Sequence, residues 1–201
     1  MATDKKKVLN IILSAVKNYD AYLKDRHFLL LFKSGNRISQ VEIGFRDSNF
    51  LHLTGVQSNL SAKKFYERCI NNRLSLKDFS LDKNGKTEQK LQVLPFLHTL
   101  PYNNCMIGEF VNSGILIQAD YFVGDSKLIL SLGFRRTGKI DIPVSLYKGD
   151  IRELTNPTNK VLAIFTRLFS EENYNNIAYL SKGISLSDIE IPDCVVIKAE
   201  T

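Results

Sequence analysis

The sequence predicts an α+β fold, with N-terminal helices packed on an antiparallel meander sheet of four to five strands. Apolar residues in the first hundred positions recur mainly at helical spacing, whereas after Pro101 strand-like runs follow one another about every ten residues. Turn residues separate these runs, and no helix is predicted between them. Helices followed by consecutive strands indicate α+β architecture rather than alternating βαβ units.

Composition bounds the class of protein. The 201 residues are 44% hydrophobic and 24% charged, which is ordinary for a globular domain and argues against wholesale disorder. No apolar run approaches the ~18 residues of a membrane span, and the three cysteines form no metal or disulfide pattern. P-loop, GxGxxG, HExxH and GxSxG motifs are missing. We therefore expect a cytoplasmic protein with no membrane partner, no metal and no other cofactor.

The first half of the chain is expected to contain a helix, a hairpin and two further helices. Residues 8–23 carry a continuous apolar face at i, i+3, i+4 spacing. Residues 27–33 and 37–45 form a hairpin around a three-residue Ser-Gly-Asn loop, and residues 50–55 are expected to be a loop or half-turn. A helix follows at 61–72, and another at 87–100 should kink at Pro95.

The second half is expected to be the sheet and a tail. Strands are predicted at residues 106–111, 115–122, 127–134, 140–147 and 161–168. Residues 170–201 carry a net charge of −4, which leaves +10 on the first 169 residues of a chain whose total is +6. We divide the chain into an N-terminal helix and hairpin elaboration (1–46), an α+β core (47–169) and an acidic C-terminal tail (170–201). The tail is either a solvated extension or a phosphate mimic folded over the basic face.

His52 is the histidine best placed for chemistry. It lies between hairpin and helix, with Thr54 and Gly55 directly after it. A loop imidazole can face a cleft, a threonine hydroxyl can orient it or a phosphate, and glycine permits close approach of a ligand. An imidazole that only bonds to its own loop fits the same spacing. His27 and His98 lie in contexts that favour structural or surface roles.

Two adjacent arginines form the second candidate. Arg135 and Arg136 end a predicted strand, and Ser145 lies on the next one. Neighbouring strand residues point to opposite faces, so only one guanidinium can face a given cleft. A guanidinium suits phosphate because it stays charged and donates two parallel hydrogen bonds. Solvated arginines at a hairpin end are the alternative.

The helix at residues 61–72 provides a third basic group. Lys63, Lys64, Arg68 and Arg73 lie on it or directly after it, and residues 61–90 contain eight basic and four acidic side chains. Lys64 and Arg68 are i, i+4 neighbours, and a like-charged pair is unfavourable without an anionic partner. These residues are candidates for nucleic-acid binding, although an ordinary solvated helix face is the simpler explanation.

With these segments identified, the sequence resembles a known nuclease family. The stretch NFLHLTG at 49–55, followed by AKKFYERC at 62–69, is similar to the fourth class of phage-associated barnase–EndoU–colicin–RelE-like nucleases. LGF at 132–134 and IPVSL at 142–146 are similar to the later strands of that family. The resemblance covers approximately residues 27–168 and makes 47–169 a nuclease-like core.

The resemblance implies two helices on a four-stranded antiparallel sheet and metal-independent cleavage of RNA by a phage or mobile-element protein. His52 would then be the base or acid, Arg135 or Arg136 the phosphate clamp, and Thr54 and Ser145 the positioning hydroxyls. The expected partner is RNA, with a host or immunity protein as a second candidate. No second histidine is evident. A non-catalytic module that binds nucleic acid or a host-defence protein, and a purely structural protein, therefore remain alternatives.

Overall fold

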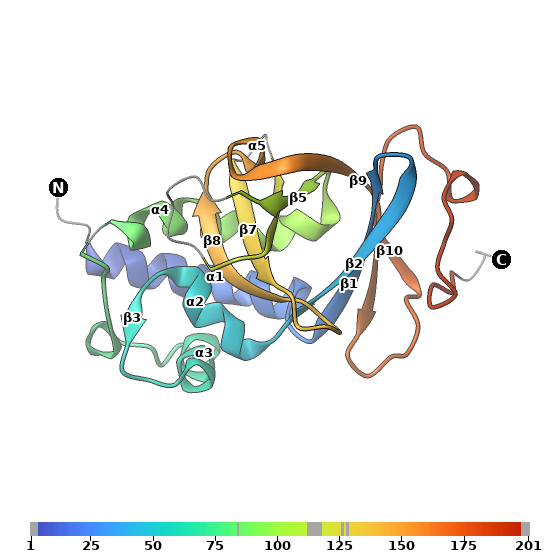
Figure 1. Ribbon diagram of the computed structural model, residues 1–201. Coiled ribbons are helices and arrows are strands. Elements are labelled where there is room, and N and C mark those ends of the chain that lie inside the picture. Colours follow the sequence, from blue (N-terminus) through green and yellow to red (C-terminus); the bar gives the residue numbers. More distant parts are fainter. Residues whose placement is uncertain (1–3, 84, 112–117, 126, 128, 198–201) are drawn as a thin grey trace.

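The computed structural model describes residues 4–83, 85–111, 118–125, 127 and 129–197 (Figure 1). In this part of the chain, a single large sheet contains eight strands in the order β2-β1-β9-β5-β6-β7-β8, and β10 pairs with β9. The α+β class is confirmed, but the predicted count of four to five strands is wrong. The strands are β1 (Arg26–Ser34), β2 (Arg37–Phe45), β5 (Met106–Phe110), β6 (Tyr121–Asp125), β7 (Leu130–Arg135), β8 (Ile142–Lys148), β9 (Thr155–Leu168) and β10 (Asn176–Leu180).

The higher strand count has two causes, the length of β9 and the addition of β10 from the tail. The first half of β9 pairs antiparallel with β5 of the meander, and its second half pairs antiparallel with β1 of the hairpin. The hairpin therefore belongs to the same sheet as the meander β5-β6-β7-β8. The sequence predicted the strands of this meander as consecutive neighbours. The hairpin loop is shorter than expected, because Ser34 pairs with Arg37 and leaves a two-residue turn.

Strand β6 lies later in the chain than predicted. Residues 115–117 of the expected strand at 115–122 lie outside the described residues, 118–120 are not strand, and β6 runs from Tyr121 through Gly124 and Asp125, where a turn was expected. Gly124 fits there because any Cβ would lie 2.8 Å from the Ile151 side chain. A glycine that looked like a turn signal instead allows a helix to pack closely on the strand.

The sheet curls until its two end strands meet. The Gly44 amide on β2 donates to the Asp141 carbonyl just before β8 at 2.9 Å, and the Asp141 amide donates to the Glu42 carbonyl at 2.8 Å. The Asp141 carboxylate also accepts a hydrogen bond from the Tyr121 hydroxyl at 2.9 Å. A bridge between the first and last strands gives the sheet a partly closed, barrel-like curvature.

The helices follow the predicted order with two additions, one at residues 50–54 and one at residues 151–154. Helix α1 (Lys5–Tyr22) is capped by Asp4, and α3 (Ala62–Ile70) by Ser61, each of which accepts a hydrogen bond from a first-turn amide. The predicted loop at 50–55 is instead the short helix α2 (Phe50–Thr54), which ends at Gly55 in the left-handed conformation. Helix α4 (Lys86–Val93) gives way at Pro95 to the 3₁₀ segment η3 (Leu94–Tyr102), which confirms the predicted break. The short elements are η1 (Asp47–Asn49), β3 (Gln57–Ser58), η2 (Leu76–Asp78), β4 (Phe79–Ser80), α5 (Ile151–Leu154) and η4 (Leu186–Asp188).

The N-terminal helix and hairpin share a hydrophobic core with the rest of the fold. One buried cluster includes Ile12 of α1, Phe28 of β1, Phe65 of α3 and Leu132 of β7. In the part of the chain that the structure describes, no helix is long and apolar enough to cross a membrane.

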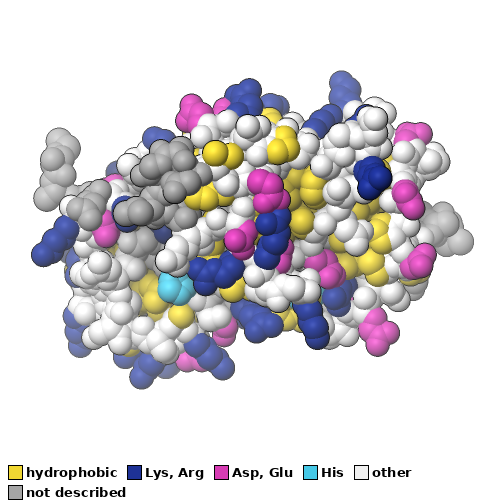
Figure 2. All heavy atoms as spheres, in the orientation of Figure 1, with side chains coloured by type: hydrophobic (Ala, Val, Ile, Leu, Met, Phe, Trp, Pro, Cys, Tyr) yellow, Lys and Arg dark blue, Asp and Glu magenta, His cyan; other side chains and the backbone are white. Residues whose placement is uncertain are grey.

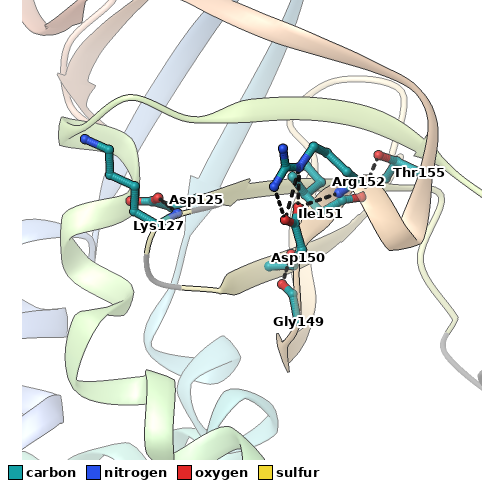
Figure 3. Close-up of polar contacts among 8 residues, drawn as sticks. Asp125, Lys127, Gly149, Asp150, Ile151, Arg152 and Thr155 are labelled. Atoms are coloured by element: carbon teal, nitrogen blue, oxygen red, sulfur yellow. Dashed lines mark hydrogen bonds and ion pairs between the residues drawn. The ribbon is translucent and has the colours of Figure 1, made fainter.

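A polar turn connects the meander to β9 (Figure 3). Asp150 caps α5 by accepting a hydrogen bond from the Arg152 amide at 2.9 Å, and the Thr155 hydroxyl donates to the Ile151 carbonyl at 2.9 Å. The buried Ser131 hydroxyl donates to the Gly149 carbonyl at 2.8 Å. These hydrogen bonds provide partners for one backbone amide and two backbone carbonyls where the chain leaves β8 and enters β9.

The acidic tail is an ordered part of the sheet. Strand β10 pairs with β9, and Tyr174 and Ile189 are buried against Leu29 and Phe165. Figure 1 shows the tail at the end of the molecule formed by β1, β2 and β9, opposite α2 and α3. The structure therefore contradicts the idea that the tail folds over the basic helix as a phosphate mimic, because its apolar residues anchor it elsewhere.

Candidate functional site

A cleft lies between helices α2 and α4 and strand β8, with Arg135 at the end of β7 also in its lining. It has a volume of about 980 Å³. His52, Arg135 and Ser145, three of the residues singled out from the sequence, all line it. Its described lining also contains Lys86, Lys90 and Lys148 and no aspartate or glutamate. The cleft is therefore a cationic site with one imidazole and three hydroxyl side chains, of Ser48, Ser145 and Tyr147, in its described lining.

The core positions His52 at this surface. Phe50 and Leu53 are fully buried, and Leu51 is nearly so, which fixes the orientation of the five-residue helix. His52 is the exposed position between them. Figure 2 shows a histidine side chain at the surface with a lysine or arginine side chain beside it. The imidazole thus reaches solvent from an element that the hydrophobic core holds in place.

The two arginines separate as strand alternation requires. Arg135 lines the cleft, and its Nη2 donates to Gln118 Oε1 at 3.2 Å. Arg136 forms an ion pair with Glu109 and lies over the Tyr121 ring, 5.2 Å from its centroid. The ion pair raises the pKa of Arg136. Arg135 is therefore the arginine that the cleft contains.

The two hydroxyl candidates also separate. Ser145 lines the cleft and pairs with Gly133 of β7. Thr54 is fully buried; its hydroxyl donates to the Leu51 carbonyl at 2.7 Å and accepts from the Val56 amide at 3.3 Å. Residues two apart on a helix point to different faces, so Thr54 cannot share the orientation of His52. The Thr54 hydroxyl therefore satisfies backbone groups at the C-terminal end of α2, and Thr54 is not among the residues that line the cleft.

Sequence reasoning missed the lysines of the cleft, of which Lys90 has the most defined environment. Its Nζ donates to the carbonyl oxygen of His52 at 2.8 Å. Partial burial, reinforced by the nearby charge of Lys86, lowers the pKa of Lys90 to about 8. The available signal was the i, i+4 spacing of Lys86 and Lys90, the same like-charged pattern recognised for Lys64 and Arg68.

The basic helix residues surround a different cavity. Lys64, Arg68 and Arg73 line a pocket of about 530 Å³ between α3 and the chain that leads to η2, whereas Lys63 is exposed on α3 outside it. Arg68 Nη1 lies 2.5 Å from Asp78 Oδ1, and the hydrogen bonds from Ser75, together with this contact, lower the pKa of Asp78. Arg68 therefore has a structural partner.

The other two histidines lie away from the cleft. The His27 ring packs against Phe169 with centroids 4.2 Å apart, and the His98 ring lies 5.3 Å from that of Tyr22. Among the described residues, no group of three or more histidine, cysteine, aspartate or glutamate side chains forms a candidate metal site.

A curled α+β sheet that presents a cationic, histidine-containing cleft is compatible with a nuclease-like protein. Residues 11–183 match the family model of the phage-Barnase-EndoU-ColicinE5/D-RelE like nuclease 4, and the chain belongs to this family. The resemblance inferred from the sequence is thereby confirmed. The match is longer than the expected stretch of 27–168 and takes in most of α1 and all of β10. Comparison with curated proteins and with solved structures gave no match.

Proposed function

We propose that this protein is a metal-independent endoribonuclease of a phage or mobile element, which cleaves cytoplasmic RNA by transesterification. The observation that carries the proposal is the convergence of His52, Arg135 and Ser145 on one cationic cleft. Family membership supports a nucleic acid as the substrate. Cationic side chains suit the phosphodiester backbone because they neutralise its charge without reading sequence.

The cleft residues supply most of the chemistry that this reaction needs. His52 accepts the proton of a ribose 2′-hydroxyl, which attacks the adjacent phosphorus. Arg135 donates hydrogen bonds to the phosphate oxygens as negative charge develops on them, and Ser145 positions the same group. The products are a 2′,3′-cyclic phosphate and a free 5′-hydroxyl.

The basic residues of α3 extend the proposed RNA contact. Lys63, Lys64 and Arg73 offer charge to phosphates that lie outside the cleft, and Arg68 holds the surface in shape through Asp78. Ala62, at the start of α3, lines the cleft itself. The helix therefore runs from the proposed reaction site toward the second pocket.

The test replaces the cleft imidazole. His52→Ala should abolish cleavage of a single-stranded RNA in the presence of EDTA, because the 2′-hydroxyl then lacks its base. A loss of about 10²–10⁴-fold in kcat is expected for removal of a general base. His98→Ala, which changes a histidine outside the cleft, is the matched control and should retain activity. EDTA-resistant cleavage that survives His52→Ala would remove this residue from the chemistry.

A chimeric substrate tests the transesterification itself. An oligonucleotide with a single ribose among deoxyribonucleotides should be cut only after that ribose, because the nucleophile is its 2′-hydroxyl. The upstream product should carry a cyclic phosphate, measurable by mass spectrometry. Cleavage of the all-deoxy strand, or products with a 5′-phosphate, would contradict the proposed reaction.

One observation favours a second candidate function. The described lining of the cleft contains a single histidine and no carboxylate, so the usual partner for acid–base catalysis is missing. A non-catalytic module would bind nucleic acid or a host-defence protein through the same cations. It predicts salt-sensitive RNA binding without any turnover by the wild-type protein.

A further inference from the structure

The proposed reaction does not yet include a group that donates a proton to the leaving oxygen. When the phosphorus–O5′ bond breaks, the departing oxygen needs a proton, or it leaves as a high-energy alkoxide. His52 takes up the proton of the 2′-hydroxyl and is not the group that donates in the same step. Within the described lining, the remaining groups that carry a transferable proton are lysines, Arg135, hydroxyls and side-chain amides.

Lys90 differs from the other cations of the cleft in how it is held. Its stem passes beside Gly55, where any Cβ would lie 2.7 Å from Lys90 Cδ, so the backbone of α2 leaves room for it. Its Nζ ends at the His52 carbonyl, 2.8 Å away. The backbone of the proposed base thus holds this ammonium beside the proposed reaction site.

The surroundings of Lys90 weaken its hold on its proton. Burial and Lys86, one turn earlier on α4, disfavour the charged form, whereas Asp82 before the helix favours it; the resulting pKa is about 8. The other titratable groups of the described cleft wall are His52 on α2, Arg135 on β7, and Tyr147 and Lys148 on β8. An arginine holds its proton too tightly to serve as an acid near neutral pH.

We propose that Lys90 is a catalytic residue, the general acid that protonates the leaving 5′-oxygen; this rests on the proposed ribonuclease function. His52 takes the proton of the 2′-hydroxyl as the oxygen–phosphorus bond forms. The phosphorus–O5′ bond breaks with its electron pair on oxygen, and Lys90 Nζ transfers one proton to that oxygen. The resulting neutral amine still has an N–H for the His52 carbonyl, and exchange with water restores both groups.

The decisive experiment changes the leaving group. Lys90→Met should lower kcat on RNA about 10²–10⁴-fold, the contribution typical of a positioned acid. On a ribonucleoside 3′-(4-nitrophenyl phosphate) the same variant should lose less than about tenfold, because nitrophenolate leaves without protonation. His52→Ala should lose activity on both substrates. Equal losses for Lys90→Met on the two substrates would overturn the acid assignment.

A charge-conserving variant separates acid catalysis from phosphate binding. Lys90→Arg keeps the cation, so KM for RNA should stay near the wild-type value while kcat falls as in Lys90→Met. Full kcat in Lys90→Arg would show that only the charge matters. Lys33→Met, which removes an exposed lysine of the distant hairpin, is the control and should match the wild type.

The pH profile gives an independent readout. The wild-type kcat/KM should fall above about pH 8 as Lys90 loses its proton. Lys86→Met removes a like charge and should raise the pKa of Lys90, which moves this basic limb to higher pH. If the basic limb of the pH profile stayed at the same pH in Lys86→Met, the assignment of Lys90 would be contradicted. If the wild-type protein cleaves no RNA, the proposed function fails; if it cleaves and only the Lys90 results disagree, this inference alone fails.

Discussion

The two histidines His52 and His27 differ in their burial and in the groups around their ring nitrogens. His52 is exposed in the cleft, whereas His27 on β1 is only 8% exposed and packs against Phe169. Among the described residues, His27 Nδ1 has no hydrogen-bond partner. Burial, together with the nearby Arg167 guanidinium, lowers the pKa of His27 to about 4. His27 is therefore uncharged in the folded protein near neutral pH, whereas the imidazole of His52 is exposed in the cleft.

The environment of His27 predicts a pH dependence of stability. In the unfolded chain His27 takes up a proton near its usual pKa of about 6.5, whereas in the folded protein it stays neutral until about pH 4. The unfolded state binds more protons between these values, so the free energy of unfolding should decrease as pH falls through this window. His27→Phe keeps a ring against Phe169 and should lose less stability on acidification.

Thermal unfolding at pH 7.5 and pH 5 measures this effect. The decrease in Tm between the two conditions should be smaller for His27→Phe than for the wild-type protein. All other acid-titrating groups are common to both proteins, so the difference isolates His27. Equal decreases would contradict the lowered pKa.

Residue-level prediction from sequence succeeded where local rules decide the outcome. Alternation along β7 predicted that Arg135 and Arg136 would separate, but not which of them faces the cleft. The helix α2 was expected to be a loop, and this error placed Thr54 beside His52 instead of on the buried face. The i, i+4 spacing of Lys86 and Lys90 marks a basic helix face in the sequence, but the place of Lys90 in the cleft depends on how α4 packs near α2.

At the scale of elements, β9 determines the architecture. Its second half is apolar and was predicted, but its first half reads Thr-Asn-Pro-Thr-Asn-Lys and lacks the alternation that marks a strand. That polar half pairs with β5, and this pairing joins the meander to the hairpin. Sequence patterns therefore identified the individual strands better than the sheet that they form, since strand pairing depends on residues far apart in the chain.

The β5–β9 junction predicts the effect of one small substitution. A Cβ at Gly108 would lie 2.4 Å from the Pro157 carbonyl oxygen and 2.6 Å from Thr155 Oγ1. The backbone must shift to relieve this overlap, so Gly108→Ala should lower the free energy of unfolding by about 3 kcal/mol. Chemical denaturation measures the loss. Gln40→Ala at an exposed position of β2 should change stability by less than about 0.5 kcal/mol. Similar stabilities for the two variants would contradict the close approach.

The whole molecule separates its charge along its length. The acidic tail is anchored at the hairpin end by Tyr174 and Ile189, and the cleft and α3 carry basic side chains at the other end. The net charge of +6 therefore understates the positive potential around the cleft. An RNA strand should approach the cleft end of the molecule, and this approach has a measurable salt dependence.

RNA binding by the His52→Ala protein, which should not turn over, provides that measurement. Each phosphate that a cation neutralises on single-stranded RNA contributes about 0.7 to the slope of log affinity against log salt. Lys148→Met and Lys64→Met should therefore each reduce the slope by about 0.7, one from the cleft and one from α3. Lys33→Met should leave it unchanged. A reduction for Lys148→Met but not for Lys64→Met would confine the RNA to the cleft, and unchanged slopes for both would contradict a phosphate-binding surface.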